Sequence, residues 1–457
     1  MAKNKNAEKT KASKFKKDLK QVQDHYLDYP YPMRDPEDEK KGIMRFQGDF
    51  LSEINHHIYK GKQDFKDGYR VLVAGGGTGD STVWIAKQLM EYPKAEVVYI
   101  DFSKTSMDIA KKRAAYHGIT NITWIEDSIL NIPDLKLGKF DFFQCSGVLH
   151  HLENPDLGIK ILSDVTKENG GGHIMVYAQY GRTGVYQIQE LLRRTGKGID
   201  NRQEEVVSAW EVINSLPSTN WFNRGADLLS DHKMFGDIGL YDMFLHKQDR
   251  AYTIPQLYDF VENAGLNIAG FTENYTRAIL NIESYFKDSA TKERIKKLPL
   301  REQQAICELI YGGIIKHDFH VSKKKDANAD FDDFENIPFV FNSDDLCKNL
   351  IDFINSGGDH IMNKYVNYKF TDSFQRELNI KLAILPNTKF LFAQLEKGDK
   401  SFSEIFEAVR KENGSKSSDQ ELLNEFVVNL VPLYTVGVIL LRHKSIKPFN
   451  NFKSIAR

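Results

Sequence analysis

The feature that most constrains the fold is a glycine-rich stretch at residues 71–81, which reads VLVAGGGTGDS. An apolar run leads directly into the glycines, and a helix-forming segment follows them. Glycine adopts the backbone angles of a tight turn, and its missing Cβ lets backbone N–H groups approach a ligand closely. A strand that turns through glycines into a helix therefore predicts a site for a nucleotide-like ligand at the end of that strand.

The residues around this stretch alternate between strand-like and helix-like segments. Strands are predicted at residues 69–74, 95–100, 122–125, 140–145 and 172–180. Helices are predicted between them at residues 81–89, 104–115 and 155–166. Such alternation predicts an α/β fold, a Rossmann-like parallel sheet with helices on both faces. The same domain is extended by a helix at 254–263, a strand at 267–271, a helical stretch to about residue 314 and a last strand at 316–321.

The chain has 457 residues, more than the ~250–300 over which one hydrophobic core usually grows. We expect the α/β domain at residues 69–322, with a mostly helical insertion at 182–250. Before it we expect a basic disordered arm at 1–20 and, at 21–68, a proline- and tyrosine-containing segment that docks on the domain or forms a lid. A charged linker at 323–338 leads to a mainly helical C-terminal domain at 339–457, which loosely resembles a winged helix.

The composition excludes several classes of partner and site. The 62 Lys and Arg residues are offset by 63 Asp and Glu residues, so no global basic field points to nucleic acid. Three widely spaced cysteines form no CxxC pair, and no metal site is predicted. The longest apolar stretch, residues 426–441, is shorter than the ~20 residues that a membrane-spanning helix needs. We expect a cytoplasmic protein without a membrane span, and the sequence leaves its oligomeric state open.

The spacing of the glycines discriminates between nucleotide-like ligands. A dinucleotide site has a small residue at the sixth position of GxGxxG, but Asp80 occupies that position when the count starts at Gly75. The spacing Gly75-x-Gly77-x-Gly79 instead resembles motif I of the class I S-adenosylmethionine-dependent methyltransferases. A carboxylate about 20 residues after the glycines, Asp101 at the end of the second predicted strand, is placed to accept the ribose hydroxyls.

The resemblance continues along the next two predicted strands. Asp127 matches the acid that holds the adenine amine in this family, and the segment GVLHHL at 147–152 resembles the turn beside the methionine portion of the cofactor. One position departs from the family, because Val73 stands where an acid near the cofactor's amino end is usual. The resemblance implies S-adenosylmethionine as cofactor, bound by Gly75, Gly76, Gly77, Thr78, Gly79, Asp101, Phe102, Asp127, Ser128, Ser146 and Gly147.

Three further segments resemble a narrower bacterial group. They are YPYPMRDPEDEKK at 29–41, YGRTGVYQIQELLRR at 180–194 and FLHKQDRAYTIPQLYDFVENAGL at 244–266. The rickettsial outer-membrane-protein lysine methyltransferases share this layout, a class I core with an inserted region and an extra C-terminal domain. The resemblance is good at motif I and the GVLHH segment but faint in the C-terminal third.

Methyl transfer is a displacement at an activated sulfonium, so the protein has to position the acceptor, exclude water and supply a deprotonated nucleophile. A strong base is needed only where the acceptor is a poor nucleophile. The candidates for catalysis are His150, His151 and Tyr180. The candidates for binding the acceptor are Tyr29, Tyr31, Arg182, Tyr186, His246 and Arg250.

These observations predict an S-adenosylmethionine-dependent methyltransferase that acts on an amine-type acceptor, a protein side chain among them. A small-molecule methyltransferase is the main alternative. A dinucleotide-dependent oxidoreductase is disfavoured by Asp80, and a catalytically silent cofactor-binding protein by the intact pair Asp101 and Asp127.

Overall fold

The computed structural model describes residues 32–225, 229–246, 248–286, 288–341, 343, 345–371, 377–414 and 416–450, without the side chains of residues 274, 359 and 413. A seven-stranded sheet forms the centre of the fold, in the order β3-β2-β1-β4-β5-β7-β6. Its strands are β1 (Arg70–Ala74), β2 (Glu96–Asp101), β3 (Ile122–Glu126), β4 (Phe140–Ser146), β5 (Thr166–Tyr177), β6 (Asn267–Phe271) and β7 (Lys316–Ser322). This is the Rossmann-like sheet that the alternating pattern predicts.

The sheet is mixed rather than wholly parallel. Strands β1 to β5 pair in parallel, but β7 lies between β5 and β6 and runs antiparallel to both. The parallel arrangement predicted from the alternating segments is confirmed for β1 to β5, and the pattern predicts no direction for β6 and β7. Three α-helices connect β6 to β7, and this connection is long enough to bring the chain back to either end of the sheet. The alternation of strands and helices therefore does not determine the direction of β7.

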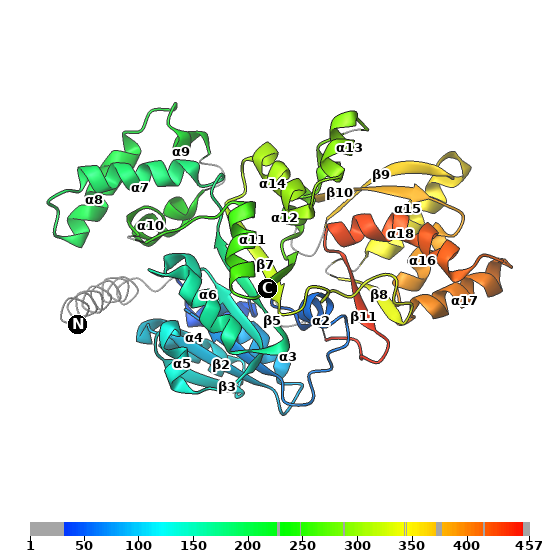
Figure 1. Ribbon diagram of the computed structural model, residues 1–457, viewed down its shortest axis with the longest axis horizontal. Coiled ribbons are helices and arrows are strands. Elements are labelled where there is room, and N and C mark those ends of the chain that lie inside the picture. The colour runs from blue at the N-terminus through cyan, green and yellow to red at the C-terminus, as the bar shows by residue number, and fades with distance from the viewer. Residues whose placement is uncertain are drawn as a thin grey trace, which may run out of the picture.

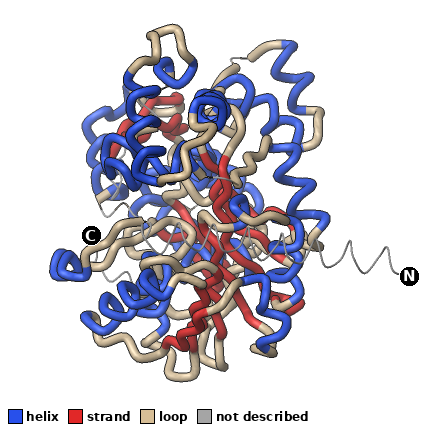
Figure 2. Tube along the Cα trace, turned by 90° about the vertical axis from the view of Figure 1, so that its left-hand side faces the viewer, coloured by secondary structure: helices blue, strands red, loops and turns tan. Residues whose placement is uncertain are grey.

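Helices cover both faces of the sheet (Figure 2). In β1, Leu72 and Ala74 join the hydrophobic cluster on one face, and Val71 and Val73 join the cluster on the other, because successive side chains of a strand point to opposite faces. The helices of the domain are α2 (Leu51–Ile58), α3 (Asp80–Leu89), α4 (Lys104–Tyr116), α5 (Ile132–Leu135), α6 (Pro155–Asp164), α11 (Ile254–Asn263), α12 (Asn274–Ile279), α13 (Ala290–Lys296) and α14 (Leu300–Tyr311). Short 3-10 helices are η1 (Pro36–Lys41), η2 (Ile129–Asn131), η3 (Leu149–His151) and η6 (Ile282–Ser284).

The inserted region has a hydrophobic cluster of its own. It lies at the upper left of Figure 1, beyond the carboxyl ends of the central strands. Its elements are α7 (Thr183–Thr195), α8 (Arg202–Asn214), α9 (Trp221–Arg224), α10 (Asp231–Leu240) and a π-helical turn η5 (Tyr241–Leu245). The chain then rejoins the domain, since the Arg250 N–H donates to the His150 carbonyl and the Tyr252 N–H to the Tyr177 carbonyl.

The C-terminal region forms a mainly helical unit with its own core. Its elements are β8 (Asn336–Val340), α15 (Leu346–Gly357), η7 (Gly358–His360), β9 (Lys364–Thr371), β10 (Glu377–Ile384), α16 (Thr388–Leu395), α17 (Phe402–Asn413), α18 (Asp419–Thr435) and β11 (Ile439–His443). Helices α16, α17 and α18 follow one another and lead into β11. Two small antiparallel sheets, β10–β9 and β11–β8, were not expected, and β8 begins inside the stretch taken for a linker.

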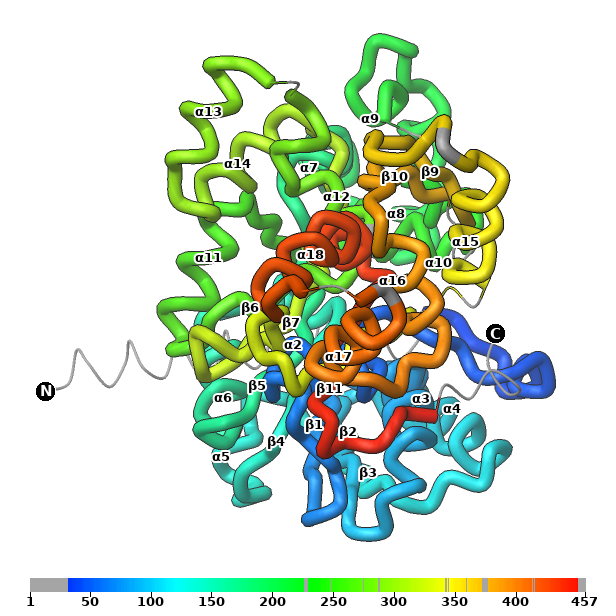
Figure 3. Tube along the Cα trace, turned by 90° about the vertical axis from the view of Figure 1, so that its right-hand side faces the viewer, coloured from blue at the N-terminus to red at the C-terminus, as the bar shows by residue number. Residues whose placement is uncertain are grey.

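Helix α2 joins the C-terminal unit to the α/β domain (Figure 3). The Leu441 N–H donates to Nδ1 of His56, 3.0 Å away, and the His443 N–H donates to the Gly61 carbonyl at 2.9 Å. Leu440 and Phe341 pack into the cluster that also holds Val71 and Val73 of β1. The two units therefore share buried apolar surface.

Two further observations concern the whole described chain. Across the described residues, no helix combines the length and the apolar character needed to cross a membrane. Cys145, Cys307 and Cys347 are buried free thiols, so they serve as small apolar side chains in this fold.

Candidate active site

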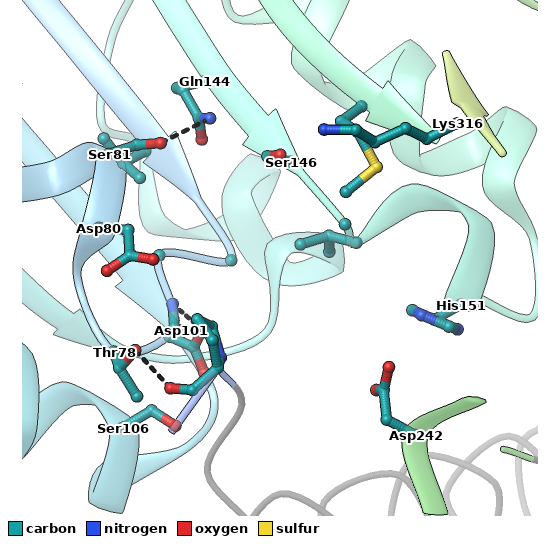
Figure 4. Close-up of a pocket in the computed structure, with 18 of the residues that line it drawn as sticks. Thr78, Asp80, Ser81, Asp101, Ser106, Gln144, Ser146, His151, Asp242 and Lys316 are labelled. Atoms are coloured by element: carbon teal, nitrogen blue, oxygen red, sulfur yellow. Dashed lines mark hydrogen bonds between the residues drawn. The ribbon is translucent and has the colours of Figure 1, made fainter. Parts of the chain in front are cut away.

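A pocket of about 490 Å³ lies at the carboxyl ends of the central strands. Its walls come from the segment before α2, the ends of β1, β2, β4 and β5, the inserted region and the start of β7. In open α/β sheets ligands bind at this edge, and the volume lies within the range of small-molecule sites. The pocket is thus the candidate active site (Figure 4).

The glycine turn after β1 forms one end of the pocket. Gly75, Gly77 and Gly79 have φ of 74°, 50° and 98°, which side chains disfavour. A Cβ on Gly76 would lie 2.2 Å from the Tyr99 ring, so this position also requires glycine. The Gly75 N–H donates to the Ile100 carbonyl at 2.8 Å, which fixes the turn against the end of β2.

Asp101 ends β2 beside this turn. Its Oδ2 accepts the Gly77 N–H at 2.8 Å, and its Oδ1 accepts the Ser103 N–H at 2.7 Å. The residue is 8% exposed, and burial raises its pKa while these two hydrogen bonds oppose the rise. Both oxygens keep lone pairs for a ligand, so the arrangement can accept a pair of ribose hydroxyls.

The structure brings most of the predicted cofactor residues together. The predicted residues that line the pocket are Gly75, Gly76, Gly77, Thr78, Asp101, Phe102, Ser128, Ser146 and Gly147. Gly79 lies at the N-cap of α3 and does not line the pocket. Asp127 is also outside the lining residues, and its Oδ1 accepts the Ser128 N–H and the Asn131 amide, each at 2.7 Å.

The segment at 32–41 packs against the glycine turn. The Thr78 hydroxyl donates to the Pro32 carbonyl at 2.8 Å, and Arg34 pairs with Asp80 at 2.8 Å. Arg113 reaches the same carboxylate from α4 at 2.7 Å. Burial would raise the pKa of Asp80, but the two guanidinium groups outweigh it and lower the pKa. Tyr29 and Tyr31, predicted to contact the acceptor, lie outside the described residues.

The other end of the pocket is built from side chains of the inserted region and β5. The Arg182 guanidinium lies over the Tyr177 ring, 3.6 Å from its centroid. Asp242 on the π-helical turn is 4% exposed and lines the pocket near His151 (Figure 4). Burial raises the pKa of Asp242 to about 7, although Arg182 and the Tyr177 hydroxyl act in the opposite direction. This end can therefore hold a carboxyl that exchanges a proton near neutral pH.

The histidines predicted for catalysis differ in their surroundings. His151 lines the pocket, and its Nδ1 donates to the Gln248 carbonyl at 2.9 Å. His150 lies behind it, packed against the His151 and Tyr177 rings at 4.1 and 4.0 Å. His150 is 1% exposed, and burial holds its pKa well below the usual value, so the imidazole is neutral at physiological pH. Tyr180 is not among the residues that line the pocket.

The other residues predicted to bind the acceptor also fall into two groups, those that line the pocket and those that do not. Arg182 lines the pocket, whereas Tyr186, His246 and Arg250 do not. Tyr186 lies on the far side of Arg182, with its ring centroid 6.0 Å from the guanidinium carbon. The His246 ring lies 3.9 Å from that of His151, and Arg250 pairs with Asp156 at the surface.

Sequence reasoning missed several residues of this pocket, among them Asp49, Tyr177 and Asp242. One signal was available for Asp242, because it is the single acid within the apolar run GLYDMFL at 239–245. An acid surrounded by apolar residues is often buried, and π-helical turns occur frequently at functional sites. Asp49 and Tyr177 carry no comparable signal in the sequence.

Comparison with known proteins identifies the domain. A family model described as a methyltransferase domain matches residues 65–215, which hold the glycine turn, Asp101 and the edge of the pocket. Residues 65–215 therefore form a methyltransferase domain. The glycine turn, which no Cβ could enter, and the carboxylate of Asp101 fit S-adenosylmethionine as its cofactor.

The methyltransferase domain is similar to several known proteins. An uncharacterised protein of Synechococcus sp. is 30% identical over 267 residues, which are 58% of this chain and 62% of that protein. The malonyl-[acyl-carrier protein] O-methyltransferase of Halalkalibacterium halodurans is 22% identical over 45% of this chain and 74% of its own length. The structure of PKMT2 from Rickettsia typhi covers 87% of this chain and 76% of its own, with a TM-score of 0.61 and 17% identity. PKMT2 in complex with AdoHcy gives a TM-score of 0.58.

Proposed function

We propose that this protein transfers the methyl group of S-adenosylmethionine to an amine, and that the amine is a lysine side chain of a protein. The observation that carries this proposal is the buried carboxyl of Asp242 at the end of the pocket away from the glycine turn. The cofactor supplies an activated methyl group. What remains for the protein is to hold the acceptor in line and to remove a proton from it.

An amine acceptor explains why a carboxyl group stands in this position. A lysine amine has a pKa near 10.4 in water, so it arrives as an ammonium and must lose one proton before it can attack. Ionised Asp242 attracts the ammonium, and a carboxyl pKa of about 7 suits it to accept that proton near neutral pH. Arg182 and Tyr177 stabilise the ionised form of Asp242, which keeps part of the population in the base state at pH 7.

Two observations support a protein as the source of the amine. The segments at 29–41, 180–194 and 244–266 resemble a bacterial methyltransferase group, and the rickettsial outer-membrane-protein lysine methyltransferases share its layout. The fold also follows that of PKMT2 over 87% of the chain, which includes regions beyond the methyltransferase domain.

The proposal is tested with S-adenosylmethionine that carries an isotope-labelled methyl group. The enzyme is incubated with dialysed and undialysed host-cell lysate, and the label is separated into protein, RNA and small-molecule fractions. We expect label in protein, recovered as methyl-lysine after acid hydrolysis, and much less label with the Asp242→Asn variant. Label that is lost under mild base, as from a carboxyl methyl ester, would contradict the amine acceptor. Label confined to small molecules would contradict the protein acceptor.

A further inference from the structure

Asp49 is a fully buried carboxylate on the wall of the pocket, in the loop before α2. It is 0% exposed, and neither of its oxygens has a hydrogen-bond partner among the described residues. Burial raises its pKa to about 6, although His173 and the nearby Ser81 hydroxyl oppose the rise. A buried carboxylate without a partner is costly, which is expected where a ligand supplies the missing charge.

His173 faces this carboxylate and lowers its pKa, but it forms no hydrogen bond with it. Its Nδ1 lies 3.8 Å from Oδ1 of Asp49, beyond hydrogen-bonding distance, while its Nε2 is hydrogen-bonded to Asp318. Burial alone would lower the pKa of His173, and Asp318 is the main group that raises it. Asp318 also accepts the Thr272 hydroxyl at 2.7 Å and pairs with Lys316 at 3.4 Å. His173 therefore shares its charge between two carboxylates, and its hydrogen bond goes to Asp318 and not to Asp49.

The loop that carries Asp49 is held firmly. The Gln88 side-chain amide on α3 donates to the Asp49 carbonyl at 2.9 Å, and its oxygen accepts the Leu51 N–H at 3.1 Å. The Gly48 N–H donates to Glu53 at 2.8 Å. Gly48 has a φ of +90°, and a Cβ there would lie 2.5 Å from Nε2 of His173. The carboxylate is thus fixed in place before any ligand arrives.

The position of Asp49 in the pocket indicates which part of a ligand it meets. Asp101 places the ribose of the cofactor beside β2, at one side of β1. Gln144 of β4 is paired with Val73 on the other side of β1, and its amide donates to Ser81 at 2.9 Å. Asp49 lines the pocket together with these residues, so a methionine portion that extends from the ribose past β1 toward β4 would meet it. Val73 and Gln144 bring no charge to this region.

We propose that the Asp49 carboxylate binds the α-ammonium group of the cofactor's methionine portion. Such an ion pair supplies the hydrogen bond that the buried carboxylate lacks and holds the methionine portion at this wall of the pocket. The proposal concerns the cofactor alone, so it stands or falls independently of the acceptor.

Calorimetry with two ligands tests this inference. One is S-adenosylhomocysteine, and the other is its deaminated analogue, in which hydrogen replaces the α-amino group. We expect the wild-type protein to bind S-adenosylhomocysteine about 10- to 30-fold more tightly than the analogue, because one charged hydrogen bond is lost. Asp49→Asn should weaken binding of S-adenosylhomocysteine by a similar factor and leave binding of the analogue unchanged, so that the preference disappears.

Asp67→Asn, at an exposed aspartate of the same N-terminal region, is the matched control and should keep the wild-type preference. The melting temperature of Asp49→Asn at pH 8 should be equal to that of the wild type or higher, because the variant removes a buried charge. The inference would be overturned if Asp49→Asn kept the preference for the amino group. It would also be overturned if the variant lost the same factor in affinity for both ligands and had a lower melting temperature than the wild type, because Asp49 would then be a structural residue.

Discussion

The two ends of the pocket achieve binding by different physical means. At the cofactor end the ligand faces backbone: a turn of glycines whose N–H groups are fixed by Ile100 and Asp101. At the opposite end, where we propose that the acceptor binds, the wall consists of large side chains: Tyr177 of β5, Arg182 at the N-cap of α7 and Asp242 of a π-helical turn. The first end is suited to bind a cofactor, whose shape is the same in every reaction cycle. The second end carries ionisable side chains whose charge can change during a reaction.

The carboxylates at the two ends of the pocket therefore differ in the role that we expect of them, cofactor binding at one end and proton transfer at the other. The carboxylate of Asp101 already accepts two N–H groups, so it acts as a fixed acceptor. Asp242 has a pKa of about 7, set by burial against the opposing effect of Arg182, so it can both lose and gain a proton near neutral pH. Substitutions at the cofactor end should therefore change affinity, and substitutions at the acceptor end should change turnover and its pH dependence.

The largest effect is expected for Asp242→Asn. The amide cannot accept a proton from the acceptor ammonium, so kcat should fall about 100- to 1,000-fold while the affinity for S-adenosylhomocysteine stays within about twofold. Wild-type turnover should rise with pH through about 7 as the Asp242 carboxyl loses its proton, and this rise should be absent from the variant. Steady-state kinetics from pH 5.5 to 9.5 with calorimetry of the cofactor product measures both quantities.

Asp200→Asn serves as the control, because Asp200 is an exposed carboxylate of the same inserted region. It should leave kcat and the pH profile unchanged. A variant at Asp242 that retains both kcat and the rise through pH 7 would remove Asp242 from the chemistry, and His151 would then be the next residue to test as a base, since it also lines the pocket.

The cofactor end could be predicted from the sequence because its residues follow one another closely along the chain. A tight turn needs glycine, and the next strand of a parallel sheet delivers its carboxylate to the same edge, so spacing alone brings Gly77 and Asp101 together. The same reasoning does not place Asp127, which was predicted to hold the adenine amine, among the residues that line the pocket. A carboxylate at the end of a third strand can satisfy itself locally, and here it accepts hydrogen bonds from Ser128 and Asn131.

The acceptor end could not be predicted in the same way. Tyr177 and Asp242 are 65 positions apart, and they approach one another only through the packing of an inserted region with no repeating pattern. Asp49 belongs to this class as well, because its burial depends on the fit of a loop against α3 and β5. Strand β7, which lies between β5 and β6, was found at the expected position, but its direction depends on the path of the three α-helices that precede it.

The second effect in size is expected for Asp101→Asn at the cofactor end. The amide places a donor against the N–H of either Gly77 or Ser103, and the charged acceptor of the ribose hydroxyls is lost. The affinity for S-adenosylhomocysteine should fall about 30- to 100-fold, which corresponds to about 2–3 kcal/mol. Asp127→Asn is the internal comparison, and its loss should stay below about fivefold because its carboxylate lies outside the pocket lining. Equal losses in the two variants would show that both carboxylates face the cofactor.

The smallest effect is expected for substitutions of Arg182, which distinguish the role of its charge from the role of its packing against Tyr177. Arg182 lowers the pKa of Asp242, so Arg182→Met should raise it and move the rise in turnover to higher pH by about one unit. Turnover should then fall about tenfold at pH 6.5 and recover above pH 9, where the carboxyl is ionised in both proteins. Arg182→Lys keeps the positive charge but not the planar contact with Tyr177, so its profile should stay at the wild-type position. If both variants lost turnover equally at every pH, Arg182 would act by packing against Tyr177, and the pKa of Asp242 would not depend on its charge.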